Sequence, residues 1–286
     1  MITVANLGDV DEDQKIMRVI DKNALVHSIG SHSAGEQTIS FPLNFLSHYQ
    51  NCEDSSRVDK NEAQTAVNVR GMRCTMHACN PTLISCWTMI DEDFDPCSAL
   101  TQSKFTKDKE DSFIIVSTVG KVKKMVQELV DMIRSVRFHY GQGDQSTSFG
   151  LMANAACGKV SYYPEQGIDI SAWEEKTDSI YGIDMPIIQG VFHKEEQRYS
   201  DEREFRFAIL LSEHRIVSKS GMCSMDTMSL LQRGLIYPKI IIKKERHYID
   251  TIYSLPDTLP GIVGYEARHL SIDASIVKGE MKESVI

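Results

Sequence analysis

The strongest constraint on the fold is a run of charged residues that continues directly into an apolar segment, at residues 201–211. The run reads Asp-Glu-Arg-Glu-Phe-Arg-Phe-Ala-Ile-Leu-Leu. Side chains of a strand point alternately to its two faces, so an extended chain from Asp201 places Glu202, Glu204 and Arg206 on one face. The other face carries the apolar side chains Phe205, Phe207 and Ile209. The pattern predicts a strand that enters the core, where charges need partners or a ligand.

Composition favours one globular protein of ordinary type. With 286 residues, of which 42% are hydrophobic, the chain is long enough to bury a sizeable core. No clear domain boundary is visible, so we expect a single domain over residues 1–286. The Gly- and Ser-rich segment 141–150 reads as a mobile loop and is the best boundary if the chain has one.

Charge and cysteine content limit the cellular compartments and the classes of binding partner that we expect for this protein. A formal charge of −9 and a pI near 5.5 argue against a protein that coats nucleic acid by bulk electrostatics. Seven cysteines without a secretory leader predict reduced thiols and a cytoplasmic protein. No stretch reaches the roughly 18 consecutive apolar residues of a membrane span, so we expect no membrane partner.

The hydrophobic pattern predicts both strands and helices. Residues 83–89 and 113–116 read as buried strands, and Ser85 and Trp87 should share a face. The clearest helix follows at residues 122–136, because its apolar residues recur at helical spacing. These residues are Val122, Met125, Val126, Leu129, Val130, Ile133 and Val136.

The remaining segments complete an α+β prediction. Ile16, Val19 and Ile20 at helical spacing after an acidic turn favour a helix over residues 16–24. Near the C-terminus we expect a strand at 238–242, a helix at 245–255 and a strand at 261–270. The predicted fold is therefore a mixed sheet of short strands with a few packed helices.

The sequence offers no strong metal or nucleophile motif. Cys74, His77, Cys79 and Cys86 cluster, but Cys-x2-His-x-Cys is too compressed for an ordinary zinc site, so buried thiols are favoured over zinc. No serine or cysteine nucleophile signature selects a base among the nine histidines. We predict no metal.

The Glu202-x-Glu204 pair is the strongest chemical signal. Two carboxylates on one strand face perturb each other's protonation, and Arg206 on the same face can hold one of them ionised. Two interpretations remain open from the residues alone. The pair is either a catalytic constellation or a salt-bridged strand edge.

Several segments resemble a broad bacterial family of uncharacterised proteins with a C-terminal Glu-x-Glu-aromatic-Arg strand. The match rests on Lys194, Tyr199 and the residues 202–206, after Phe192. It extends more loosely to residues 41–62, 85–87 and 160–163 in the same chain order. The family implies no established reaction.

A fainter resemblance is to ADP-ribosyltransferases, which combine an arginine, a serine-containing strand and a Glu-x-Glu pair in this order. The resemblance implies that NAD is a substrate, that Glu204 stabilises the oxocarbenium ion as nicotinamide leaves, and that Glu202 orients or deprotonates the acceptor. The serine corresponds to Ser85. Arg57 or Arg73 would bind the pyrophosphate, and Trp87 or Tyr163 would stack on a flat ring.

These observations lead to an expected function and two alternatives. The expectation is a cytoplasmic, NAD-using, ADP-ribosyltransferase-like enzyme of the toxin or phage-defence type, with a small nucleotide as substrate and a protein or nucleic acid as acceptor. The first alternative is a non-catalytic binding or regulatory module. The second is a metal-assisted nuclease, which requires Asp59, Glu62 and Glu204 to converge.

Overall fold

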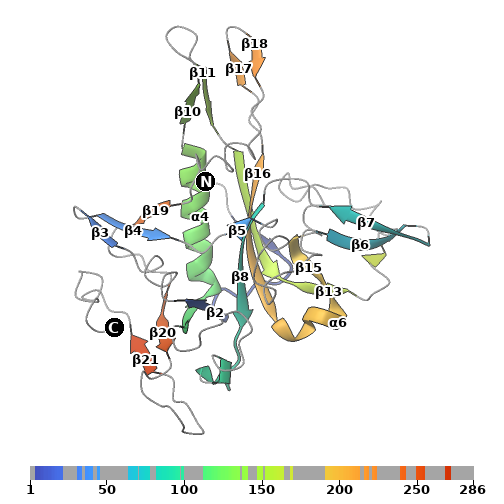
Figure 1. Cartoon of the computed structure of the whole chain (residues 1–286), viewed down its shortest axis with the longest axis vertical. Helices are drawn as coiled ribbons and strands as arrows, with labels where there is room; N and C mark the ends of the chain where they lie inside the picture. Colours follow the sequence, from blue (N-terminus) through green and yellow to red (C-terminus); the bar gives the residue numbers. More distant parts are fainter. Residues whose placement is uncertain are drawn as a thin grey trace.

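The computed structural model describes sheet over most of its well-placed residues, together with one long helix (Figure 1). The described residues are 4–21, 31–33, 36–40, 44–45, 64–69, 71–77, 82–96, 98–99, 112–135, 137–140, 147–150, 152–163, 168–169, 191–212, 216–218, 221–223, 239–242, 249–254 and 268–271.

A nine-stranded sheet forms the centre of the protein, in the order β1-β12-β16-β8-β2-β9-β20-β21, with β5 paired to β8. Strand β1 pairs with β12 in parallel, and the other neighbours are antiparallel. The bounds are β1 Ala5–Leu7, β2 Lys15–Asp21, β5 Asn44–Phe45, β8 Thr82–Met89, β9 Ser112–Thr118, β12 Met152–Lys159, β16 Glu204–Ser212, β20 Thr251–Ser254 and β21 Arg268–Ser271. The strands predicted at 83–89 and 113–116 are confirmed as β8 and β9.

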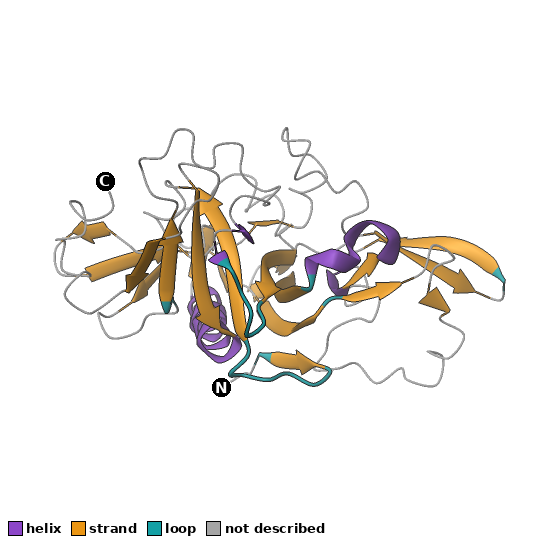
Figure 2. Cartoon of the chain, turned by 90° about the horizontal axis from the view of Figure 1, so that it is seen from below, coloured by secondary structure: helices purple, strands orange, loops and turns teal. Residues whose placement is uncertain are grey.

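Helix α4, Val119–Ser135, covers one face of this sheet and confirms the predicted helix. Figure 2 shows it almost end-on beside the strands. Its apolar side chains form one buried cluster with inward residues of β2, β8, β9, β12 and β16, including Phe205, Phe207 and Ile209. Burial of this stripe is the main reason why a helix forms here, because most of the stability of a helix in a protein comes from packing of its apolar face.

The opposite face of β16 is covered by residues 191–202. This segment contains β15 His193–Glu195, the short helix α6 Glu196–Tyr199 and the 3-10 turn η3 Ser200–Glu202, and β15 pairs in parallel with β13 Ser161–Tyr163. In Figure 1, α4 and these elements lie on opposite sides of β8 and β16. Val191 and Phe192 pack there with Ala208 and Leu210 in a second cluster. Strand β16 is therefore buried on both faces.

Four smaller sheets complete the described part of the chain. Their orders are β14-β6-β7, β10-β11, β17-β18 and β19-β4-β3. The bounds are β3 Ser31–Ser33, β4 Glu36–Ser40, β6 Gln64–Val69, β7 Met72–His77, β10 Arg137–Tyr140, β11 Thr147–Gly150, β14 Ile168–Asp169, β17 Ile216–Ser218, β18 Gly221–Cys223 and β19 Lys239–Ile242. The strand predicted at 238–242 is thus confirmed as β19.

Three predicted segments are wrong. The helix expected at 16–24 begins instead as strand β2, and Ile16 and Ile20 face α4 while Val19 packs in a third cluster on the other face. Spacing of β-branched residues is ambiguous in such a short segment, and central placement in the sheet decides it. Residues 251–254 are strand β20 rather than helix, and residues 147–150 are strand β11 rather than loop.

The start of β16 also differs from the prediction. The strand begins at Glu204, and Glu202 lies in the preceding 3-10 turn.

None of the helices in the described ranges is long and apolar enough to span a membrane.

Candidate functional site

The site is built around the first residues of β16. Glu204 and Arg206 point away from α4, on the same face as Cys86 of β8, which lies opposite Arg206 in the ladder. Both charged residues are buried in a central strand, with 5% and 0% of their surfaces exposed. The strand is not an edge of the sheet, so the predicted exposed salt-bridged edge does not describe this pair.

Arg206 holds both carboxylate oxygens of Glu204. Its Nε donates to Glu204 Oε1 at 2.5 Å and its Nη2 donates to Oε2 at 3.3 Å. The third nitrogen, Nη1, donates to the carbonyl oxygen of Val191 at 2.5 Å. Such a fork fixes the orientation of both groups.

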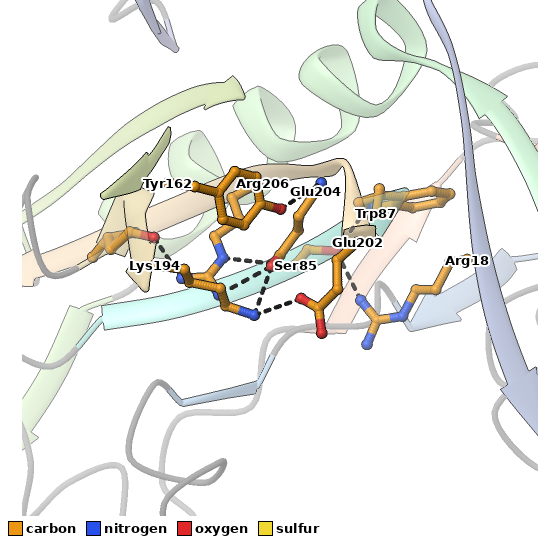
Figure 3. Close-up of polar contacts among 9 residues, drawn as sticks. Arg18, Ser85, Trp87, Tyr162, Lys194, Glu202, Glu204 and Arg206 are labelled. Atoms are coloured by element: carbon orange, nitrogen blue, oxygen red, sulfur yellow. Dashed lines mark hydrogen bonds and ion pairs between the residues drawn. The ribbon is translucent and has the colours of Figure 1, made fainter. Parts of the chain in front are cut away.

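Lys194 joins the two glutamates into one cluster (Figure 3). Its Nζ lies 2.8 Å from Glu204 Oε2 and 2.9 Å from Glu202 Oε2, and 4.7 Å from the centre of the Tyr199 ring. Two cations and two carboxylates balance in charge. We call Lys194, Glu202, Glu204 and Arg206 the charged cluster.

Residues of β13 and β8 make further contacts with Glu204 of the charged cluster. The backbone N–H of Glu204 donates to the Tyr162 hydroxyl at 3.2 Å, and Tyr162 lies opposite Lys194 in the parallel ladder. Burial raises the pKa of Tyr162, so the hydroxyl stays protonated at neutral pH. The Cys86 thiol contributes a further hydrogen bond to Glu204.

The two carboxylates differ in protonation. Burial opposes ionisation of Glu204, but Arg206 and Lys194 outweigh it and hold its pKa well below the ordinary value. Burial raises the pKa of Glu202, and the neighbouring charge of Glu204 adds to this, although Lys194 opposes both. The Glu202 side chain is 31% exposed against 6% for Glu204. Glu202 is therefore the carboxyl group suited to proton transfer with a ligand.

Ser85 and Trp87 lie on the other face of the sheet. They stand opposite Phe207 and Phe205 in the ladder and so face α4. Trp87 Nε1 donates to Ser85 Oγ at 2.9 Å, which confirms that the two side chains share a face. Arg18 Nη1 also donates to Ser85 Oγ, at 3.1 Å. The structure therefore separates Ser85 from Glu204 by the sheet itself.

The other predicted ligand-binding residues are dispersed. Arg73 is exposed on β7, in the β14-β6-β7 sheet rather than beside the charged cluster. The Tyr163 hydroxyl accepts from the backbone N–H of Ala66 at 3.4 Å, which directs it toward β6. Arg57, Asp59 and Glu62 lie outside the described residues.

Sequence reasoning missed Lys194 and Tyr162 as members of the cluster, and Arg18 as the partner of Ser85. Lys194 is in the family-like segment, but no local pattern shows that it reaches both glutamates. It does so because β15 lies against β13, and β13 follows β12, the neighbour of β16. Only long-range pairing brings these side chains together.

The described residues contain no group of three or more His, Cys, Asp or Glu side chains placed to hold a metal ion. Burial raises the pKa of the Cys157 thiol to about 12, so it is not a thiolate at neutral pH and is a poor nucleophile.

A scan against protein-family models and searches of curated proteins and solved structures found no match for this chain.

Proposed function

We propose that the charged cluster is the active site of a NAD-using, ADP-ribosyltransferase-like enzyme in which Glu202 meets the substrate. The observation that carries the proposal is the difference between the two carboxylates. Glu202 is partly exposed and has a raised pKa, whereas both oxygens of Glu204 are held by cations. The proposal keeps for Glu202 the deprotonation of the acceptor that the resemblance implied, and it makes Glu204 an internal scaffold instead of the residue that stabilises the oxocarbenium ion.

In this proposal each residue of the charged cluster has a separate task. The bond between the ribose carbon and the nicotinamide nitrogen breaks, and its electron pair leaves with nicotinamide. An acceptor N–H or O–H group then bonds to the ribose carbon and gives its proton to Glu202, whose raised pKa makes it a better base than an ordinary carboxylate. Glu204 fixes the Lys194 ammonium group, which in turn holds the Glu202 carboxylate in place.

The buried charges support a functional site. Burying ions is costly, and replacing such pairs by apolar residues is often neutral or stabilising, so stability alone gives little reason for this cluster. Perturbed carboxyl groups beside a specific cation are typical of functional sites. The wider proposal is a single cytoplasmic α+β domain over residues 1–286, with a toxin or phage-defence role.

A second function is favoured by a different observation. Ser85 faces α4, and Arg73 lies in another sheet, so the described residues do not unite the elements of a transferase site. A non-catalytic binding or regulatory module explains this separation, with Glu204 and Arg206 as internal scaffold. The metal-assisted nuclease stays a prediction, because Asp59 and Glu62 are outside the described residues.

Nicotinamide release from NAD, measured with candidate protein and nucleic-acid acceptors, tests the enzyme against the module. We expect Glu202→Gln to lower kcat about 10²-fold in a protein that still folds, because it removes proton transfer but keeps the shape of the side chain. Glu196→Gln is the matched control, since Glu196 is exposed on α6. Absent turnover in the wild type contradicts the enzyme and favours the module. Equal turnover in Glu202→Gln contradicts the role of Glu202 in the reaction.

A further inference from the structure

Arg203, between the two glutamates, has an unusual backbone. Its φ of 47° and ψ of 46° place it in the left-handed region, and it is the one non-glycine residue with positive φ among those that the structure describes. In that region Cβ approaches the following carbonyl oxygen, so residues other than glycine rarely adopt it. The surrounding contacts must therefore maintain this conformation.

Those contacts connect Arg203 to the end of β8. Its carbonyl oxygen accepts from the N–H of Met89 at 3.0 Å, and its Nη2 donates to Asp91 Oδ1 at 2.6 Å. Its Nη1 donates to the other Asp91 oxygen. About half of each side chain is exposed, so the ion pair adds little stability, but the two-pronged geometry restricts orientation.

The left-handed turn determines where Glu202 lies. In the ladder Glu204 stands opposite Thr88, so an extended residue at 203 would continue the strand and place Glu202 opposite Ile90. Instead Glu202 ends the 3-10 turn η3, and the left-handed Arg203 turns the chain away from β8. From this turn Glu202 Oε2 reaches Lys194 Nζ at 2.9 Å.

We propose that Arg203 is a positioning residue, whose left-handed backbone and fork to Asp91 hold the Glu202 carboxylate at Lys194. Its importance for catalysis rests on the proposed function, but the positioning itself does not. Glu204 needs no such device, because Arg206 and Lys194 hold its side chain and β16 holds its backbone. The effect of Arg203 is therefore specific to one of the two glutamates.

Carboxyl-carbon NMR of glutamate-labelled protein tests the positioning directly, with the Glu202 signal assigned from its loss in Glu202→Gln. We expect the Glu202 titration midpoint to fall toward that of an exposed glutamate in Arg203→Ala, and in the same direction in Asp91→Asn. Arg203→Lys, which keeps one charged donor, should restore part of the wild-type value. The control is Lys121→Ala, which removes a comparably exposed ion pair with Asp250 elsewhere.

The outcomes separate this inference from the proposed function. An unchanged Glu202 midpoint in folded Arg203→Ala overturns the positioning role, even if Glu202→Gln abolishes turnover. A shift that Lys121→Ala reproduces also overturns it, because the effect would then be global. If the wild type releases no nicotinamide, the titration still tests Arg203. If it does, we expect kcat/KM to fall about tenfold in Arg203→Ala, since small displacements of a reacting group are costly.

Discussion

At the residue scale, the charged cluster shows how one carboxylate becomes internal scaffold while its neighbour stays available. Glu204 is enclosed by Arg206 and Lys194 on a strand buried on both faces, whereas Glu202 is displaced by the turn at Arg203. The same residue type, two positions apart, acquires opposite protonation behaviour. Burial raises the pKa of both groups, and the difference arises because Arg206 and Lys194 outweigh burial at Glu204 but Lys194 does not outweigh it at Glu202.

Glu204→Gln should destabilise the protein strongly at neutral pH. The substitution leaves Arg206 and Lys194 buried with one anion fewer, and breaking a buried pair in this way typically costs about 3–5 kcal/mol. Urea unfolding measures the loss, and Glu196→Gln on the surface should change the free energy of unfolding by less than about 0.5 kcal/mol. A Glu204→Gln protein as stable as the wild type would show that the pair carries no net stability.

The two glutamates should change the free energy of unfolding with pH in opposite directions. The folded pKa of Glu204 lies below its unfolded value near 4.5, so its stabilising contribution is present above 4.5 and is lost as the pH falls further. The stability difference between wild type and Glu204→Gln should therefore shrink below pH 4.5. Glu202 has a raised folded pKa, so its ionisation reduces stability as the pH rises above 4.5. The free energy of unfolding of Glu202→Gln, measured with urea across pH 4 to 8, should lack that decline. A variant whose pH profile runs parallel to that of the wild type would contradict the sign predicted for its glutamate.

At the element scale, two glycines have different roles. Gly158 of β12 pairs with Leu7 of β1, and a Cβ built on it would lie 2.8 Å from the Leu7 carbonyl oxygen. Gly71 forms the turn between β6 and β7 with a φ of +80°, and its N–H donates to Asn68 Oδ1 at 2.8 Å. A Cβ on Gly71 meets nothing within 4 Å. One glycine allows close approach of two strands, and the other allows a backbone conformation.

Gly158→Ala should displace β1 from the sheet. We expect the amides of residues 5–7 to exchange with solvent faster, while those of β16 keep their protection, because β1 is the end strand of the nine-stranded sheet. Gly71→Ala is the comparison, and it should cost only about 1 kcal/mol through backbone strain. Hydrogen exchange measures the first effect and urea unfolding the second. Unchanged exchange in β1 would show that Leu7 moves without losing its pairing.

At the scale of the whole molecule, one cluster joins α4 to five strands of the central sheet. Trp87 is 2% exposed within this cluster, next to residues from β16 and β8. Because these elements come from distant parts of the sequence, loss of the cluster should disrupt all of them together. The sheet centre and α4 are expected to unfold as one cooperative unit.

Leu129→Ala tests that unit. Leu129 is fully buried on α4, so its truncation should lower the free energy of unfolding by about 2–5 kcal/mol. In a Trp173→Phe background, Trp87 fluorescence and far-ultraviolet circular dichroism should then shift together along the urea axis. Lys124→Ala, on the exposed side of α4, is the control. Two separated transitions would show that α4 and the sheet unfold independently.

Local patterns in the sequence were enough to locate several elements and one face. The apolar spacing located α4, the apolar runs located β8 and β9, and alternation placed Glu204 and Arg206 opposite Phe205 and Phe207. These predictions succeed because periodicity reflects a single interface with the core. The same reasoning failed for β2, where Ile16, Val19 and Ile20 fit a helix, and burial on both faces decided for a strand.

The local pattern of residues 202–206 was sufficient to predict that charged side chains enter the core, whereas contacts between distant segments set which of these side chains meet. Lys194 reaches both glutamates through the β13–β15 pairing, and the left-handed Arg203 places them differently. Antiparallel register puts Ser85 on the α4 side and Glu204 on the other. Strand register and turn geometry depend on long-range pairing that no local pattern contains. Local chemistry therefore identified the charged residues, and the assembled sheet left Glu202 as the more exposed of the two carboxylates.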